Sequence, residues 1–132
     1  MHPKEHQANL KESIIEIERI IVEGLEKHQR SLGFHTSAAA VDMLEIIFHE
    51  NNLIDPGMVI KHEWFNSSRK IKEKIAFDFP EKKEMLKLTA NIENVRNKLC
   101  YGKRQPASIL EQLVLDFQKL KTLFNEVTDH EL

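Results

Sequence analysis

The sequence has few of the residues that cross-link a chain or interrupt its regular structure. Its 132 residues include one cysteine, four glycines and four prolines. A single cysteine excludes an internal disulfide and is typical of proteins from a reducing compartment, so we expect a cytoplasmic protein. The glycines and prolines lie between stretches with regularly spaced apolar residues. The sequence therefore predicts an all-helical chain with short connections.

Long apolar runs, internal repeats and low-complexity segments are also missing. Without a long apolar run, we expect no secretory leader, no membrane-spanning helix and no membrane partner. The formal net charge is -2, which argues against nucleic-acid binding over the whole surface and confines any such contact to a local patch. With 41% hydrophobic residues, we expect a single domain over residues 1–132.

The spacing of apolar residues predicts the helices of this domain. The first apolar stripe ends before Gly33, whereas residues 1–6 are polar and expected to be flexible. We expect residues 33–37 to interrupt the chain, with Thr36 or Ser37 capping a second, largely apolar and central helix. The expected fold class is all-α, an up-and-down bundle of about five helices. The predicted helices cover roughly residues 7–32, 38–50, 56–76, 80–101 and 106–128.

The histidines form no metal-binding pattern along the sequence. Glu45 and His49 are four residues apart, whereas the Glu-x-x-His pairs of di-iron bundles are three apart. No two histidines have the spacing of a zinc protease motif. The sequence therefore predicts neither a metal site nor a cofactor. Arg30 and His35 form an Arg-x4-His string, but it lies across the first predicted break, so we interpret it as coincidental.

The most informative stretch is residues 95–104, where the fourth predicted helix ends. Arg96 borders the buried stripe of that helix, so its guanidinium must reach a carboxylate, a phosphate or water. We expect Gly102 to end the helix in a left-handed conformation and Pro106 to begin the next helix. In the simplest interpretation, the nearby cations complement the negative end of the helix dipole. These cations are Lys98, Lys103 and Arg104.

The segment Arg-Asn-Lys-Leu-Cys-Tyr-Gly within this stretch resembles the motif of HEPN domains (higher eukaryotes and prokaryotes nucleotide-binding), in which an Arg is followed after four to six residues by a His. The matching residues are Arg96, Asn97, Leu99 and Gly102, and Tyr101 stands where the motif has His. The resemblance implies an HEPN-like helical bundle in which the Arg and His of two protomers meet across a dimer cleft. For catalytic members it implies a metal-independent endoribonuclease, in which Arg stabilises the phosphorane charge and His transfers the proton.

Two functions stay open at this level. The first is an HEPN-like protein of toxin–antitoxin or defence type, with a groove that faces phosphate, RNA or a nucleotide. Because tyrosine has an ordinary pKa of about 10 and is a poor general base near neutrality, we expect weak or absent RNase activity. The catalytic residues predicted for this function are Arg96, Asn97 and Tyr101, and the predicted nucleic-acid-binding residues are Lys98, Lys103 and Arg104.

The second function is a non-catalytic bundle that forms a homodimer or docks on a partner. The resemblance suggests a small nucleotidyltransferase as that partner. Apolar residues in excess of one seam on the last helix fit a second contact surface, although burial within the monomer explains them almost as well. In a generic bundle, Arg96 would pair with an acidic side chain and Tyr101 would pack in the core.

Overall fold

The structure is a computed structural model that describes residues 2–132. It contains five α-helices and two 3-10 helices, and no described residue lies in a strand, which confirms the predicted all-α fold class. Among these residues, no helix is both long enough and apolar enough to cross a membrane. The elements in chain order are α1 (Pro3–Glu23), η1 (Leu25–His28), α2 (Gln29–Glu50), η2 (His62–Asn66), α3 (Ser68–Lys74), α4 (Lys82–Tyr101) and α5 (Ala107–Val127).

The chain is helical almost from its N-terminus. α1 begins at Pro3 and is capped by His2, whose ring Nδ1 accepts a hydrogen bond from the backbone N–H of Lys4 at 3.1 Å. The carboxylate of Glu5 accepts a hydrogen bond from the backbone N–H of His2 at 2.9 Å, which completes a capping box. Residues 3–6 of the segment expected to be flexible therefore lie within α1, while Met1 lies outside the described residues.

The first two long helices are separated at Gly24 and not at the predicted break. Gly24 has a φ of 121°, a conformation that side chains with a Cβ rarely adopt, so α1 ends there. α2 then runs from Gln29 through Gly33 without interruption, and the predicted break and cap at residues 33–37 are wrong. Gly33 instead permits close packing, because a Cβ at this position would lie 2.9 Å from the Cβ of Leu99 on α4.

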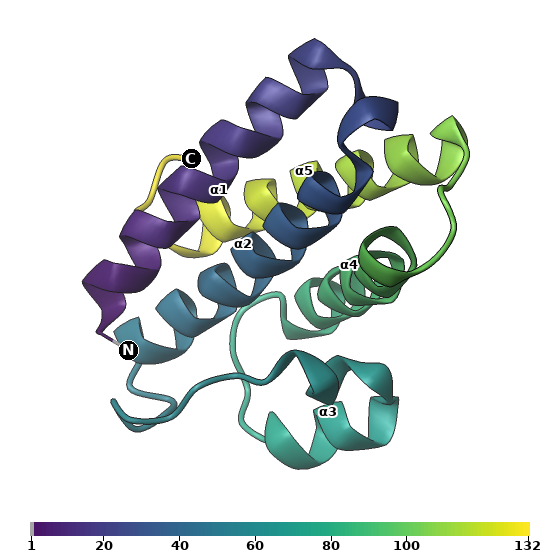
Figure 1. Cartoon of the computed structure of the whole chain (residues 1–132). Helices are drawn as coiled ribbons and strands as arrows, with labels where there is room; N and C mark the ends of the chain where they lie inside the picture. The colour runs from purple at the N-terminus through teal and green to yellow at the C-terminus, as the bar shows by residue number, and fades with distance from the viewer. Residues whose placement is uncertain (1) are drawn as a thin grey trace.

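The central helix is α2, as its apolar sequence predicted (Figure 1). It packs against α1 and α4, and every residue from 39 to 48 is buried. α1 runs antiparallel to α2, and α5 lies behind this pair and packs mainly against α4. Because both flanks of α2 are covered by helices, each buried polar side chain on it needs a partner inside the bundle.

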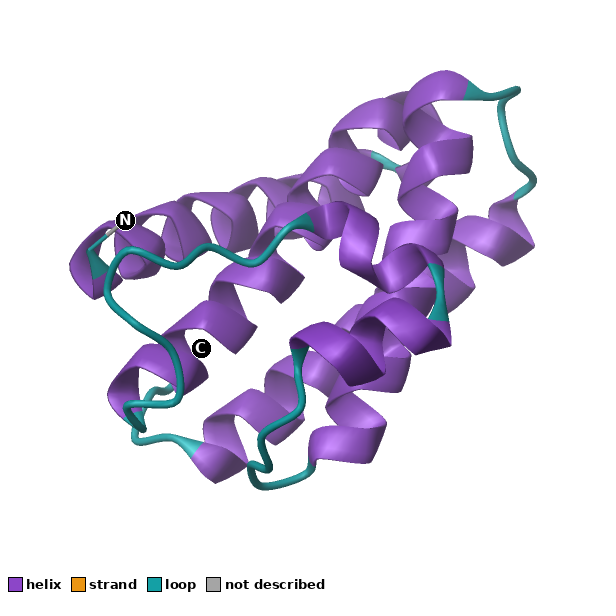
Figure 2. Cartoon of the chain, turned by 90° about the horizontal axis from the view of Figure 1, so that it is seen from below, coloured by secondary structure: helices purple, strands orange, loops and turns teal. Residues whose placement is uncertain are grey.

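The segment between α2 and α4 is the least regular part of the fold. Figure 2 shows it as loops and short helical turns, and no helix covers residues 51–61. The predicted third helix, from Pro56 to Ile75, is therefore wrong in extent: only η2 and α3 are helical. The segment is nevertheless anchored, because Trp64 and Phe65 are buried against the bundle. The apolar residues of this segment are therefore removed from water without a continuous helix.

The last two helices follow the prediction closely. α4 and α5 begin within two residues of their predicted starts and end within one residue of their predicted ends. Gly102 follows α4 with a φ of -100°, so the predicted left-handed conformation is wrong. A side chain is excluded there for another reason, since a Cβ would lie 2.8 Å from the backbone oxygen of Lys98. This tight turn brings the start of α5 back toward α2.

Candidate functional site

The structure places Arg96 on a different side of α4 from the other two predicted catalytic residues, Asn97 and Tyr101. Arg96 and Tyr101 are five residues apart on one continuous helix, so their side chains project about 140° apart. Asn97 and Tyr101 share an outward face and are both exposed, with Tyr101 76% exposed. Arg96 is half-buried. Within one chain, Arg96 and Tyr101 therefore do not converge on a single substrate atom.

Arg96 lies on the side of α4 that faces α2. Its neighbours along this side are Glu93, which accepts a hydrogen bond from the Ser37 hydroxyl, and Cys100, whose thiol contacts the backbone oxygen of Arg30 at 3.7 Å. Across residues 2–132, no carboxylate forms an ion pair with Arg96. The expectation for a generic bundle, an ion pair at Arg96 and a buried Tyr101, is therefore wrong on both points.

An open pocket of about 460 Å³ lies where α4 ends against the start of α2. It brings together Tyr101 and Arg104, which the sequence analysis proposed, with Arg30, which it set aside. The lining residues include two arginines and a tyrosine and no acidic residue, so the chemistry of the pocket suits a phosphate or another anion. The pocket residues are Gln29, Arg30, Leu99, Cys100, Tyr101, Gly102 and Arg104.

The wall of this pocket is held in place by a pair of hydrogen bonds across 76 positions of sequence. Gln29 Oε1 accepts a hydrogen bond from the backbone N–H of Gln105 at 2.8 Å, and Gln29 Nε2 donates to the Gln105 oxygen at 3.0 Å. Gln29 itself is buried. In addition, Arg104 donates to the backbone oxygen of Glu26 in η1. The loop that carries Arg104 is therefore fixed before any ligand arrives, which lowers the entropic cost of binding.

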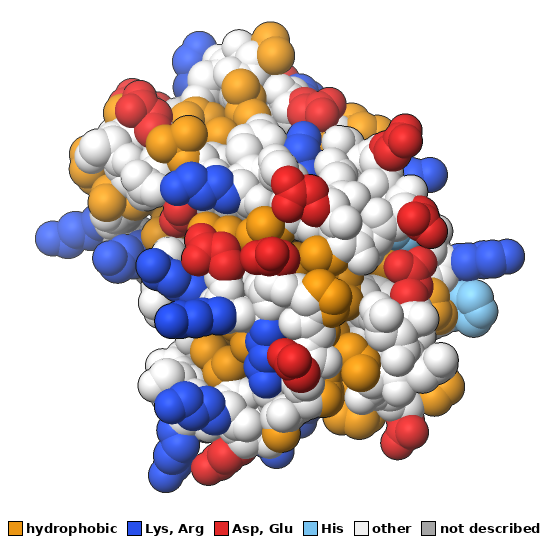
Figure 3. Space-filling model, turned by 180° about the vertical axis from the view of Figure 1, so that it is seen from behind, with side chains coloured by type: hydrophobic (Ala, Val, Ile, Leu, Met, Phe, Trp, Pro, Cys, Tyr) orange, Lys and Arg blue, Asp and Glu red, His pale blue; other side chains and the backbone are white. Residues whose placement is uncertain are grey.

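The other predicted binding residues, Lys98 and Lys103, are exposed and line no described pocket. They add positive charge to a side of the molecule that is already basic. Figure 3 shows Lys and Arg side chains gathered along its left edge, which is the α3 and α4 side of the fold. Such charge attracts a polyanion toward the surface without fixing its position.

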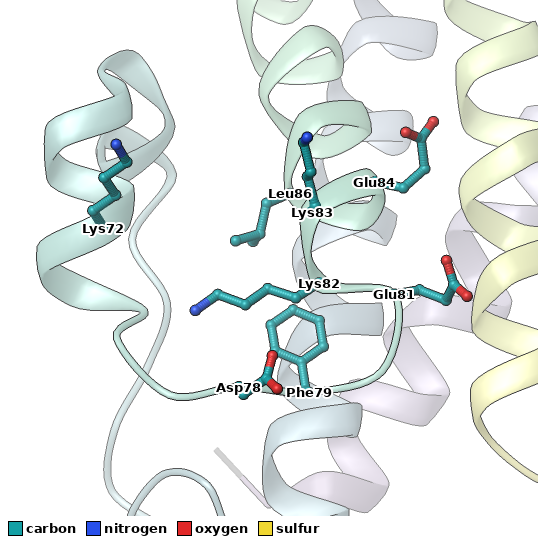
Figure 4. A pocket seen from close by; sticks show the side chains of 8 residues that line it. All are labelled: Lys72, Asp78, Phe79, Glu81, Lys82, Lys83, Glu84 and Leu86. Carbon is teal, nitrogen blue, oxygen red and sulfur yellow. The ribbon is translucent and has the colours of Figure 1, made fainter.

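The largest described pocket lies elsewhere, between α3 and the start of α4 (Figure 4). Lys82 extends toward α3 and donates a hydrogen bond to the backbone oxygen of Phe77 at 2.7 Å, whereas Glu81 and Glu84 lie on the side toward α5. The charges that line it are balanced, because three amines stand against three carboxylates. These are Lys72, Lys82 and Lys83, and Asp78, Glu81 and Glu84. This balance gives the pocket no preference for an anion or a cation.

A buried carboxylate organises a second polar cluster in the middle of the bundle. Glu93 is 2% exposed, and its Oε1 is 2.6 Å from Nδ1 of His62 and accepts a hydrogen bond from the Ser37 hydroxyl. His62 therefore has a fixed ring orientation while remaining half-exposed. Glu93 is eight residues from Tyr101, or about 12 Å along the helix axis. His62 cannot serve the same phosphate as the pocket at the end of α4.

A third cluster joins the start of α1 to α2. His6 Nδ1 lies 2.7 Å from Asp42 Oδ1, and His6 Nε2 contacts Glu45. His49 lies one turn beyond Glu45, with its ring centroid 6.1 Å from that of His6. Burial raises the pKa of Asp42 and lowers the pKa of His49. Spacings along one helix do not reveal this cluster, because His6 lies on α1 whereas Glu45 and His49 lie on α2.

The sequence predicted Tyr101 and Arg104 of the pocket at the end of α4, but not Arg30. Arg30 is part of the Arg-x4-His string, which was interpreted as coincidental because residues 33–37 were expected to form a turn. With α2 continuous there, His35 projects away from Arg30 and contacts the Ser13 hydroxyl at 3.2 Å. Of the two residues of this string, only Arg30 lines the pocket. No sequence pattern pointed to Gln29.

Comparison with known proteins adds no identification: no family model, no curated protein and no solved structure matches this chain.

Proposed function

We propose that this protein is an HEPN-like, RNA-directed bundle of toxin–antitoxin or defence type, which binds a phosphate of RNA or of a nucleotide at the end of α4. The observation that carries the proposal is the carboxylate-free pocket lined by Arg30, Tyr101 and Arg104. Arg96, half-buried and without an ion pair, extends this cationic region along α4 toward α2. The exposed Lys98 and Lys103 add electrostatic attraction for the RNA backbone that does not depend on its sequence.

Binding is favoured over cleavage by the composition of the pocket. Metal-independent cleavage of RNA requires a group that takes the proton from the ribose 2′-hydroxyl. No histidine lines the pocket, and Tyr101 offers a hydroxyl that donates a hydrogen bond more readily than it accepts a proton near neutrality. We therefore expect weak or absent RNase activity from the wild-type protein.

The test is binding of a fluorescently labelled single-stranded RNA, followed by anisotropy at low salt with EDTA present. We expect Arg30→Gln and Arg104→Gln each to weaken binding about tenfold or more, because a hydrogen bond to a charged group contributes about 1.5–3 kcal/mol. Arg96→Ala should also weaken binding. Tyr101→Phe should have a smaller effect, since it removes a hydroxyl and leaves the charges unchanged.

Arg69→Gln is the matched control, because it removes the same charge from an exposed position on α3 whose side chain is 82% exposed. If Arg69→Gln weakens binding as much as Arg30→Gln, the interaction is a general charge effect and the pocket is not the site. Cleavage of the same RNA is measured in parallel with wild type and Tyr101→His. Efficient cleavage by wild type that survives Arg96→Ala would contradict the proposed mechanism.

A second candidate function is self-association, as the family resemblance implies for an HEPN-like protein. The specific observation in its favour is an apolar strip on the outward face of α1, where Ile15 is 63% and Val22 is 87% exposed. We expect light scattering to give a dimer for wild type and a monomer for Val22→Glu. Lys11→Glu, on the same face but without loss of apolar area, is the control. A wild-type monomer that forms a complex only when co-expressed with a nucleotidyltransferase would favour the partner-docking alternative.

A further inference from the structure

The cluster at the start of α1 contains polar atoms that have no hydrogen-bond partner within the protein. His6 is 4% exposed and Glu45 is 2% exposed, so water does not readily satisfy them. The unpartnered buried atoms of the described residues are His6 Nε2, Glu45 Oε2 and His49 Nε2. A buried polar atom without a hydrogen bond is costly, and three such atoms in one cluster need an explanation.

These three atoms converge. One ligand atom from each of the three residues lies within 4.8 Å of the others, although the residues come from two helices. Glu45 and His49 are one turn apart on α2 and project on the same side, and His6 reaches them from α1. His6 Nε2 and Glu45 Oε2 are already in contact, but without the geometry of a hydrogen bond.

The surrounding hydrogen bonds aim the unpartnered atoms at one point. Nδ1 of His6 lies 2.7 Å from Asp42 Oδ1, which favours the tautomer that carries its proton on Nδ1 and its lone pair on Nε2. Glu45 Oε1 accepts a hydrogen bond from the backbone N–H of Ile60 at 2.5 Å, so only Oε2 is left to bind something else. A carboxylate behind a ligating histidine and a hydrogen bond to the spare carboxylate oxygen are the usual supports of metal ligands.

We propose that His6, Glu45 and His49 bind a divalent transition-metal ion of the zinc class, with Asp42 orienting His6. Two imidazole nitrogens and one carboxylate oxygen form a ligand set that zinc accepts, with a fourth position left for water. Ligand bonds of about 2.1 Å place tetrahedral ligand atoms about 3.4 Å apart. On ion binding, the widest pair must therefore move closer, and the contacting atoms His6 Nε2 and Glu45 Oε2 must move apart, both by side-chain adjustment. His49 is half-buried, which leaves a route for the ion to enter.

The chemistry of the ligands supports this assignment over an ion pair alone. A protonated His6 could bridge Asp42 and Glu45, but it would leave His49 Nε2 without a partner. A soft thiolate is absent from the cluster, so the site differs from a thiolate-rich zinc finger or iron–sulfur centre.

The test uses tag-free protein treated with a chelator and then dialysed. Wild type should bind one Co²⁺ per chain, with the visible absorption bands of a four- or five-coordinate ion, and Zn²⁺ should displace it. His49→Ala should weaken Zn²⁺ binding at least 100-fold, and Asp42→Asn should weaken it about 10- to 100-fold, as expected when a supporting hydrogen bond to a ligand is lost. His130→Ala, which removes another histidine paired with a glutamate, should have no effect.

A readout on the unmodified chain guards against variants that fail to fold. In the NMR spectrum of wild type, Zn²⁺ should shift the imidazole resonances of His6 and His49 and leave those of His28 and His130 unchanged. Absence of stoichiometric Co²⁺ or Zn²⁺ binding by wild type, or binding that shifts the other histidines instead, would overturn the proposal. The RNA-binding assay contains EDTA and so measures RNA binding by the metal-free protein. The result of the metal test therefore does not affect the result of the RNA test, and either proposal can fail alone.

Discussion

Phe48→Ala should lower the free energy of unfolding by about 3–5 kcal/mol, as expected for a fully buried phenylalanine. Phe48 is 0% exposed and lies on the central helix. Its ring packs edge-on against Phe77 and Phe79, with centroid distances of 4.8 and 4.9 Å. Loss of the ring leaves a cavity and also removes the contact that holds the loop before α4 on the bundle. Urea denaturation followed by circular dichroism measures the change.

Phe34→Ala is the matched control for this prediction, because Phe34 lies on the same helix but is 52% exposed. It should change stability by less than about 1 kcal/mol, since surface substitutions have small effects. A loss for Phe48→Ala as small as that for Phe34→Ala would mean that the loop containing Phe77 and Phe79 does not pack against Phe48 as described.

Gly33→Leu should lower stability by about 1–3 kcal/mol or more, as overpacking of a close helix contact does. A Cβ at residue 33 would meet the Cβ of Leu99 at 2.9 Å and Sγ of Cys100 at 3.4 Å. The Cβ of Leu99 cannot move without the backbone of α4, so the two helices must separate. Because Leu99 and Cys100 also line the pocket at the end of α4, the same variant should weaken RNA binding.

Gly57→Leu is the corresponding control, because a Cβ at residue 57 would meet nothing within 4 Å. We expect its effect on the urea midpoint to be within about 0.5 kcal/mol of zero. Gly33→Ala should be milder than Gly33→Leu, because it adds only the Cβ, and the gain of about 1 kcal/mol in helix propensity partly offsets that clash. A Gly33→Leu variant as stable as wild type would show that α2 and α4 are farther apart at this level than described.

Apolar periodicity determined the parts of the fold that depend on local information. α4 and α5 follow regular stripes and are bounded by Pro80, Gly102 and Pro106, so their positions could be read from the sequence within two residues. The centrality of α2 followed from its apolar residues on all sides. These properties depend on residues that are neighbours along the chain, and a single sequence contains that information.

Tertiary packing determines the features that the local sequence pattern predicted wrongly. Gly33 and Gly24 look alike as helix breakers, but only Gly24 has the positive φ that requires glycine, whereas Gly33 makes room for Leu99. The segment after Pro56 has the apolar content of a helix. Its apolar residues are nevertheless buried from loops and short helical turns that lie against the bundle. To tell a glycine that ends a helix from one that permits close packing, or a buried loop from a buried helix, one must know which distant residues pack against it.

The candidate sites divide in the same way. Tyr101 and Arg104 were found from the sequence because a motif and a run of charge lie close together along the chain. Arg30 joins them only because α2 passes beside the end of α4, and His6 joins Glu45 and His49 only because α1 folds back along α2. The sequence by itself thus determined the fold class, most of the helices and half of one pocket. The tertiary structure decided which side chains meet although they are 39 or more positions apart in the sequence. Such meetings depend on how the helices pack and on no local pattern.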